Sequence, residues 1–323
     1  MRLRSGLMDT KFYENCRLCP RYCGVNRVRG GGAGQTGVCG ETDQLRVAYV
    51  GPHFGEEPPI TGENGSGTVF FTGCSLRCSF CQNYQISQKG VGIEITARKL
   101  LEKIEGMIRD HCVHNINFVT PDHFFPHVFR LVSLLRKDGF DLPVLFNLSG
   151  YQAPELLRIA EDYADIYLPD FKYSDTSLAA KLSTCRNYPD VALKAIGEMV
   201  KQKGFFDTFL KRSVMAKKGV LVRHLILPGK VENSVDALTS LFLEFGKELP
   251  LSLMSQYHPV ARQKDGALNR FLSQEEFDSV YAHTIDLGFE NLFVQFPEKR
   301  SGSQSASSPY LPNFQQAKPF GSP

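Results

Sequence analysis

The sequence has no apolar run that approaches the roughly 18 residues a membrane-spanning helix needs, which argues against an integral membrane protein. Its first residues, from Met1 to Asp9, lack the apolar stretch of a secretory signal peptide, and early acidic residues argue against a transit peptide. A net charge of +3 and a pI near 8.3 are too mild to indicate nucleic acid binding. No internal repeat is evident. We therefore expect a cytoplasmic protein that engages neither membranes nor nucleic acid.

The composition is that of an ordinary globular protein. The 323 residues suffice for one large domain or two smaller ones, with 42% hydrophobic and 22% charged residues. Nine cysteines occur without a secretion signal, which favours metal ligation over disulfide bonds. Cys112 and Cys185 are isolated and are interpreted as incidental thiols. The other seven cysteines lie in the first quarter of the chain.

Three of these seven, Cys74, Cys78 and Cys81, form a C-x3-C-x2-C loop directly after a short apolar segment. Thiolates select zinc, copper(I) or iron–sulfur clusters, and both structural zinc and a saturated [4Fe–4S] cluster usually take four cysteines. Three close cysteines therefore predict a [4Fe–4S] cluster with one iron open to a small molecule. A zinc knuckle and three unrelated core cysteines are the alternatives.

The remaining four cysteines form a second group near the start of the chain: Cys16, Cys19, Cys23 and Cys39. Pro20 and Gly24 stand among them and would turn the backbone around a metal. Four sulfurs would complete a zinc site or an auxiliary iron–sulfur cluster, and ligand softness does not separate the two. Four free thiols are the alternative.

Short apolar strands alternate with amphipathic helices, which predicts an α/β fold with parallel strands. The six expected strands are 69–71, 116–119, 144–147, 165–168, 221–227 and 251–257. One helix is expected to begin at the N-cap Thr96 and another to stop near Gly139. Further helices should open at Pro154 and at the capping box Ser273-Gln-Glu-Glu276, and the second of these should end at Gly288.

Polar residues stand just beyond these strands. In parallel barrels the chemistry lies at the carboxyl ends of the strands, so we expect these side chains to surround one site. A solvated loop residue or a helix cap is the alternative for each of them singly. The candidates are Thr120, Asp122, Ser149, Asp170, Lys172, Arg223 and His258.

The cysteine loop resembles the signature of the radical S-adenosylmethionine (SAM) superfamily. The resemblance implies a partial (β/α)6 barrel, a [4Fe–4S] cluster and SAM, whose reductive cleavage gives a 5'-deoxyadenosyl radical that abstracts hydrogen. No catalytic side chain is then needed for the first step, because the cofactor carries the chemistry. We expect a cysteine-rich N-terminal segment at 1–50, a radical SAM core at 51–300 and a disordered tail at 301–323.

A closer resemblance is to the pyruvate formate-lyase activating enzymes, in the PflX-like or PflA-like branch. It covers the chain from about Cys16 to Gln295. The runs that carry it are Cys16-Arg-Leu-Cys-Pro-Arg-Tyr-Cys, Gly55-Glu-Glu-Pro-Pro-Ile-Thr-Gly, Gly65-Ser-Gly, Cys81-Gln-Asn, Asn117-Phe-Val-Thr-Pro-Asp-His, Asn147-Leu-Ser-Gly-Tyr, Tyr167-Leu-Pro-Asp-Phe-Lys-Tyr and Val222-Arg-His-Leu-Ile-Leu-Pro-Gly.

By this resemblance Asp170 and Lys172 correspond to a pair that contacts SAM, and Arg223 to an arginine that meets the SAM carboxylate through its guanidinium fork. His258 corresponds to a histidine near the adenosyl group, with a loop histidine before Pro259 as the alternative.

The sequence departs from the activating enzymes in one place. They carry Gly-Gly-Glu where this chain has Val119-Thr-Pro-Asp-His123, which leaves the binding of the SAM amino group open.

Three functions remain open at this stage. The first is a glycyl-radical activase, and the second is a radical enzyme, of the oxidoreductase type, acting on a small molecule or peptide. The third is a non-catalytic iron–sulfur or zinc protein. As partners we expect a flavodoxin- or ferredoxin-type electron donor and, for an activase, a protein or peptide substrate.

Overall fold

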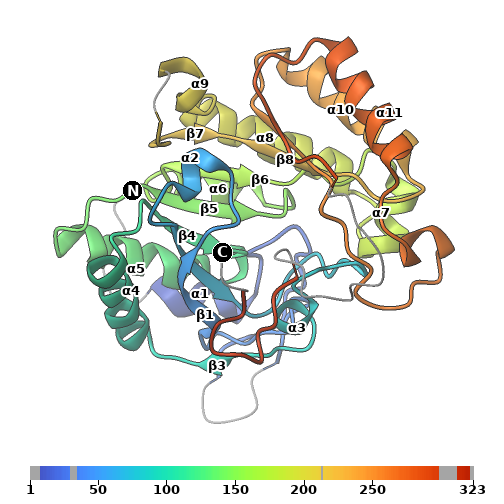
Figure 1. Ribbon diagram of the computed structural model, residues 1–323. Helices are drawn as coiled ribbons and strands as arrows, with labels where there is room; N and C mark the ends of the chain where they lie inside the picture. Colours follow the sequence, from blue (N-terminus) through green and yellow to red (C-terminus); the bar gives the residue numbers. More distant parts are fainter. Residues whose placement is uncertain (1–7, 30–34, 212–213, 298–310, 321–323) are drawn as a thin grey trace.

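The computed structural model describes residues 8–29, 35–211, 214–297 and 311–320. Its centre is a seven-stranded sheet in the order β3-β1-β2-β4-β5-β6-β7 and a three-stranded sheet in the order β10-β9-β8 (Figure 1). The strands are β1 (Arg46–His53), β2 (Ser66–Phe71), β3 (Ile93–Glu94), β4 (Ile116–Val119), β5 (Val144–Leu148), β6 (Ile166–Pro169), β7 (Gly219–Val220), β8 (Val222–Leu225), β9 (Leu251–Met254) and β10 (Leu292–Val294).

The parallel strands form one curved succession. β2, β4, β5, β6 and β7 pair in parallel, as do β8, β9 and β10. The two sheets meet at a parallel bridge between Asp170 and Arg223, and the Phe171 N–H donates to the Arg223 carbonyl oxygen at 2.8 Å. β1 is antiparallel to both β2 and β3. The expected α/β fold, a partial (β/α)6 barrel, is confirmed.

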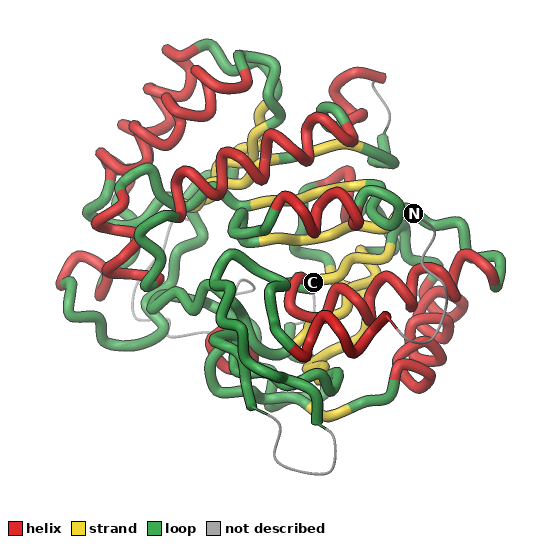
Figure 2. The backbone as a smooth tube through the Cα atoms, turned by 180° about the vertical axis from the view of Figure 1, so that it is seen from behind, coloured by secondary structure: helices red, strands yellow, loops and turns green. Residues whose placement is uncertain are grey.

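Helices surround the strands (Figure 2). None of those in the described part of the chain is long and apolar enough to span a membrane. The helices are α1 (Met8–Glu14), α2 (Pro58–Thr61), α3 (Tyr84–Ser87), α4 (Ala97–His111), α5 (Phe125–Lys137), α6 (Pro154–Ala160), α7 (Thr176–Ser183), α8 (Tyr188–Lys203), α9 (Asp207–Lys211), α10 (Val231–Phe245) and α11 (Gln274–Leu287), with short 3-10 helices η1 (Asp122–Phe124) and η2 (Gly266–Asn269).

All six predicted strands are present, and the one predicted at 221–227 corresponds to β8, which directly follows the short β7. The predicted caps are confirmed: the Thr96 side chain accepts from the Lys99 N–H, and Ser273 and Glu276 form the capping box of α11. β1, β3, β7 and β10 were not predicted. β1 lacks the alternating burial that marks a strand with one buried face, and the other three are very short.

The loop after β1 enters the barrel. Ile60 of α2 is fully buried, and the Asn115 side chain donates to its carbonyl oxygen at 2.8 Å. On the other side of the loop, the Ala216 N–H donates to the Pro59 carbonyl oxygen at 2.9 Å. These contacts fix the loop, and with it Glu56 and Glu57, among the strands.

The structure bears on two expected segments. β1 runs across residue 50, where the cysteine-rich segment was expected to end. Within the expected disordered tail, residues 301–310 and 321–323 lie outside the described residues. Residues 311–320 are described, and Phe314 is buried against Phe70 of β2.

Candidate functional site

The predicted cysteine loop lies between β2 and α3, at the carboxyl end of the first parallel strand. Gly73 turns the chain there with φ +78°, and a Cβ on it would lie 2.8 Å from the Cys39 carbonyl oxygen. Glycine is therefore required at this position. The Cys74 N–H donates to the same carbonyl oxygen at 3.2 Å, which fastens the N-terminal segment to the loop.

Each of the three sulfurs in this loop accepts a hydrogen bond. The donors and acceptors are Leu76 N and Cys74 Sγ at 3.4 Å, Ser183 Oγ and Cys78 Sγ at 3.1 Å, and Ser87 Oγ and Cys81 Sγ at 3.3 Å. Such hydrogen bonds stabilise thiolates and tune the potential of iron–sulfur clusters. The donor set therefore fits a cluster.

Cys78 is buried, and Cys74 and Cys81 are partly buried beside it. Burial raises the pKa of Cys81 to about 11, with a further contribution from Cys78, and burial likewise raises the pKa of Cys74. They will lose their protons when a cation compensates the thiolate charge. In the described residues no three His, Cys, Asp or Glu side chains converge on a single ion. Thiolates of a [4Fe–4S] cluster bind separate irons and need no such convergence.

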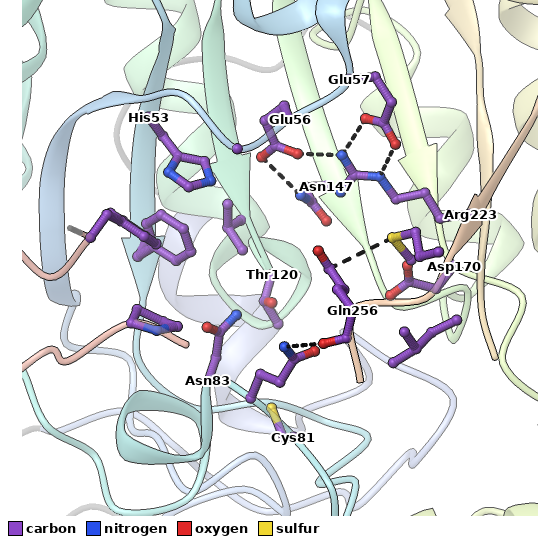
Figure 3. Close-up of a pocket in the computed structure, with 18 of the residues that line it drawn as sticks. His53, Glu56, Glu57, Cys81, Asn83, Thr120, Asn147, Asp170, Arg223 and Gln256 are labelled. Atoms are coloured by element: carbon purple, nitrogen blue, oxygen red, sulfur yellow. Dashed lines mark hydrogen bonds and ion pairs between the residues drawn. The ribbon is translucent and has the colours of Figure 1, made fainter. Parts of the chain in front are cut away.

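These cysteines line one end of a cavity of about 1030 Å³. That volume is at the upper end for small-molecule sites. Figure 3 shows Cys81 at one end of the cavity and Glu56, Glu57 and Arg223 at the other, with Thr120 and Asp170 between them. Five of the seven predicted site residues line the cavity: Thr120, Ser149, Asp170, Lys172 and Arg223.

Asp170 and Lys172 form a tight ion pair beside the cysteines, with Lys172 Nζ 2.5 Å from Asp170 Oδ2. Burial alone would lower the pKa of Lys172, but Asp170 and the nearby Cys78 raise it above its usual value. Lys172 therefore keeps its positive charge in spite of its burial. Both side chains keep some exposure to the cavity, where they can reach a ligand.

Ser149 is held next to this pair by a close backbone approach. Gly150 has φ +79°, and a Cβ there would lie 2.1 Å from the Asp170 carbonyl oxygen, which excludes any other residue. The Tyr188 hydroxyl lies 2.9 Å from both the Ser149 and the Asp170 carbonyl oxygens. The run Asn147-Leu-Ser-Gly-Tyr151 thus brings the ends of β5 and β6 together.

The other two predicted residues, Asp122 and His258, are not among the side chains that line this cavity, although their neighbours Thr120 and Gln256 are. Asp122 is fully buried, accepts from the Ser75 hydroxyl at 3.1 Å and acts electrostatically on both Cys74 and Cys19. It lies between the two cysteine groups. His258 is also buried, with Nδ1 3.0 Å from the Gln256 carbonyl oxygen.

Arg223 binds two carboxylates to which the sequence analysis gave no role. Its Nε donates to Glu57 Oε1 at 2.9 Å and its Nη2 to Glu57 Oε2 at 2.5 Å, and Nη2 also donates to Glu56. Asn117 Nδ2 donates to Glu56 Oε1 at 2.8 Å. The guanidinium expected to meet the SAM carboxylate is therefore already paired, and the group carries one net negative charge.

The surroundings of Glu56 favour its ionised form although the side chain is buried. Burial alone would raise the pKa of Glu56, but the Arg223 guanidinium lowers it below its usual value. His53 lies in the same cavity, and its Nδ1 has no hydrogen-bond partner among the described residues. Burial lowers the pKa of His53, so it is neutral near pH 7. The sequence signal for this site was the pair Glu56-Glu57 followed by two prolines. Because β1 was not predicted, nothing in the sequence placed these two acids inside the barrel.

Thr120 follows β4, where the activating enzymes carry Gly-Gly-Glu, and has φ +53°. This left-handed conformation favours glycine and strains a β-branched residue. We expect Thr120→Gly to raise the free energy of unfolding by about 1 kcal/mol, because relief of strain exceeds the added flexibility of the unfolded chain. Thr120→Val keeps the strain and should not stabilise. Urea denaturation measures both, and a less stable glycine variant would contradict the argument.

The four N-terminal cysteines lie close to one another and to the loop. Cys23 Sγ and Cys39 Sγ are both within 3.6 Å of the Cβ position at Gly37, and Arg27 Nη1 donates to Cys16 Sγ at 3.5 Å. Arg27 is fully buried and also donates to the His123 carbonyl oxygen at 3.0 Å. Its cation favours thiolates nearby. A second metal at this group stays a prediction, with zinc and iron–sulfur both open.

Metal analysis tests this prediction. We expect Cys39→Ala, purified without oxygen, to contain less metal than the wild type by one zinc ion or by one cluster of iron, because a buried ligand is lost. Cys112→Ala, which removes an exposed thiol, is the matched control and should keep the full content. Equal metal content in all three proteins would leave the quartet as free thiols.

Comparison with known proteins gives a family match. The model of the radical SAM superfamily matches residues 68–239. An uncharacterised protein of Methanocaldococcus jannaschii is 28% identical over 297 residues, which are 85% of this chain and 78% of that protein. The pyruvate formate-lyase-activating enzyme of Clostridium pasteurianum is 28% identical over 173 residues, 52% of this chain and 65% of that enzyme.

Solved structures match at low identity. SuiB of Streptococcus suis bound to S-adenosylmethionine aligns with a TM-score of 0.46 and 12% identity over 69% of this chain. HydG, a maturase of the [FeFe]-hydrogenase, aligns with a TM-score of 0.47 and 13% identity over 70% of this chain. The chain spans 48% of the former and 50% of the latter.

Proposed function

The chain belongs to the radical SAM superfamily, whose members use a [4Fe–4S] cluster and SAM, and we propose that Cys74, Cys78 and Cys81 hold that cluster for reductive SAM cleavage. When bound and reduced by one electron, the cluster and SAM supply methionine and a 5'-deoxyadenosyl radical that takes a hydrogen atom from the substrate. The observation that carries the proposal is the set of three hydrogen-bonded sulfurs at one end of the large cavity.

The chain's own residues prepare that cavity. The Asp170–Lys172 pair offers a carboxylate and an ammonium beside the cysteines, which complement the amino and carboxylate groups of SAM. Thr120 adds a hydroxyl and a backbone carbonyl where the Gly-Gly-Glu run is missing. The surrounding apolar wall, including Leu76 and Phe80, excludes water from a radical intermediate. An electron donor of the flavodoxin or ferredoxin type remains the partner we propose.

Two substrate classes are consistent with this chemistry. The 28% identity to a pyruvate formate-lyase-activating enzyme supports activation of a glycyl-radical enzyme, in which the substrate is a protein loop. The volume of the cavity and its position among the strands support a small molecule or a short peptide as the alternative.

Anaerobic reconstitution with iron and sulfide tests the proposal. After reduction with SAM present, chromatography should detect 5'-deoxyadenosine from the wild-type protein. A fully loaded and reduced protein that forms none, with glycyl-radical enzymes and small-molecule candidates supplied in turn, would overturn it.

A further inference from the structure

Residues 311–320 lie against the inner face of the sheet, beside β1 and α3 (Figure 1). Phe314 and Phe320 pack there with Phe70 of β2 and Val119 of β4, both at the mouth of the barrel. The strand succession does not close in the described part of the chain, because the edge strands β3 and β10 are not paired with each other. The segment packs on side chains of β1 and β2, next to the β3 end of this open side.

Aromatic contacts seat the segment. The Phe320 ring lies 4.1 Å from the His53 ring and 5.3 Å from the Phe70 ring, measured between centroids, and 5.7 Å from the Tyr49 ring. The Phe314 ring lies 5.3 Å from that of Phe70. One aromatic side chain of the sheet thus contacts both rings of the segment.

Hydrogen bonds join the segment to the helix that follows the cysteine loop. The Phe314 N–H donates to Gln85 Oε1 at 2.7 Å, and Gln85 Nε2 donates to Asn313 Oδ1 at 3.5 Å. The segment also folds on itself, since the Asn313 N–H donates to the Pro319 carbonyl oxygen at 2.8 Å. It is a compact turn and not a strand of either sheet.

The segment forms part of the cavity wall. Pro312, Ala317, Lys318 and Phe320 line the same cavity as the three cysteines. Residues 315–318 are exposed on their outer side. One layer of chain, held mainly by two rings and one glutamine, therefore separates this part of the cavity from solvent.

We propose that residues 311–320 are a displaceable cover on the open side of the cavity, and that displacement of this cover admits the substrate. The cover is inferred from its contacts, whereas its role in admitting a substrate rests on the proposed function. The sheet and α3 contribute only side chains to the contacts described above. The segment can therefore exchange between seated and displaced states without a rearrangement of the sheets.

Thiol labelling of the iron-free, full-length protein tests the cover without any catalysis. A maleimide on a polyethylene glycol chain should label Cys81 slowly in the wild type. In Phe314→Ser/Phe320→Ser the rate should rise on the order of tenfold, since the seated population falls with the lost contacts. Gln315→Ser/Gln316→Ser, which changes exposed residues of the same segment, is the matched control and should label like the wild type.

Two internal cysteines report on the state of the fold. Exposed Cys112 should label equally in every protein, and buried Cys185 should stay unlabelled. Labelling of Cys185 in the double variant would mean that its fold is disturbed. The test then uses Gln85→Ala in place of the double variant, because this change removes hydrogen bonds from the segment and leaves both phenylalanine rings. The proposed cover would be overturned if Cys81 is labelled at the same rate in the wild type and in a folded variant, either Phe314→Ser/Phe320→Ser or Gln85→Ala.

A parallel assay of 5'-deoxyadenosine separates the two proposals. Faster Cys81 labelling without 5'-deoxyadenosine from any protein would keep the cover and overturn the proposed function. Formation of 5'-deoxyadenosine with unchanged Cys81 labelling in the variants would support the proposed function and overturn the cover.

Discussion

Replacing Cys78 with alanine is expected to abolish the formation of 5'-deoxyadenosine by the reconstituted, reduced protein. Its sulfur accepts a hydrogen bond from the Ser183 hydroxyl. The loop offers only three thiols for the proposed cluster, so no other thiol of the loop can replace it. Removing a residue that only hydrogen-bonds to a metal ligand typically lowers activity by about 10- to 100-fold. Removing a ligand itself should therefore lower 5'-deoxyadenosine formation by more than about 100-fold.

Cys185→Ala is the matched control for this substitution. Cys185 is also a buried thiol, and it accounts for the effect of deleting a buried sulfur outside the loop. We expect it to retain iron content and 5'-deoxyadenosine formation. Iron analysis and circular dichroism on each protein distinguish a missing cluster from a lost fold. Product formation by Cys78→Ala near the wild-type level would remove the cluster from this loop.

Replacing Arg223 with methionine is expected to destabilise the protein by about 3–5 kcal/mol at pH 8, because two buried carboxylates lose their cation. Glu56 and Glu57 are almost fully buried, so water cannot compensate them. Arg98→Met, which removes an exposed partner of Glu102, is the control and should leave the free energy of unfolding nearly unchanged. Urea denaturation measures all three proteins.

The loss should depend on pH in a defined direction. In the wild type the folded-state pKa of Glu56 is lowered, so its contribution is present above the unfolded value and is lost as pH falls through the folded value. Without Arg223, burial raises that pKa, and protonation at low pH relieves the unpaired charge. The difference between wild type and Arg223→Met should therefore shrink between pH 8 and pH 5. A constant difference would show that packing, and not charge, explains the loss.

Local features of the chain were predictable from sequence because they depend on neighbouring residues. The spacing of Cys74, Cys78 and Cys81 predicts a ligand set by itself, and the caps at Thr96 and Ser273 need only the next turn of helix. Apolar periodicity located the six main strands, and a parallel α/β order follows from their alternation with helices. The strand ends then indicated five residues that the structure places around one cavity.

Contacts between distant segments were not predictable in this way. Glu57 and Arg223 are 166 positions apart, and the loop that brings them together follows a strand without a clear pattern. Asp122 satisfies the same rule of strand ends as Asp170, yet it is fully buried and accepts a hydrogen bond from the Ser75 hydroxyl. Composition favoured disorder for the end of the chain, whereas the cavity wall offers Phe314 and Phe320 an aromatic surface.

The sequence by itself therefore determined the α/β class, the main parallel strands and the class of cofactor, since each depends on patterns along the chain. Only the tertiary structure decided which charges are paired inside the barrel and what covers its open side. The physical reason is that desolvation and ring packing depend on neighbours in space, which folding brings together from remote parts of the chain.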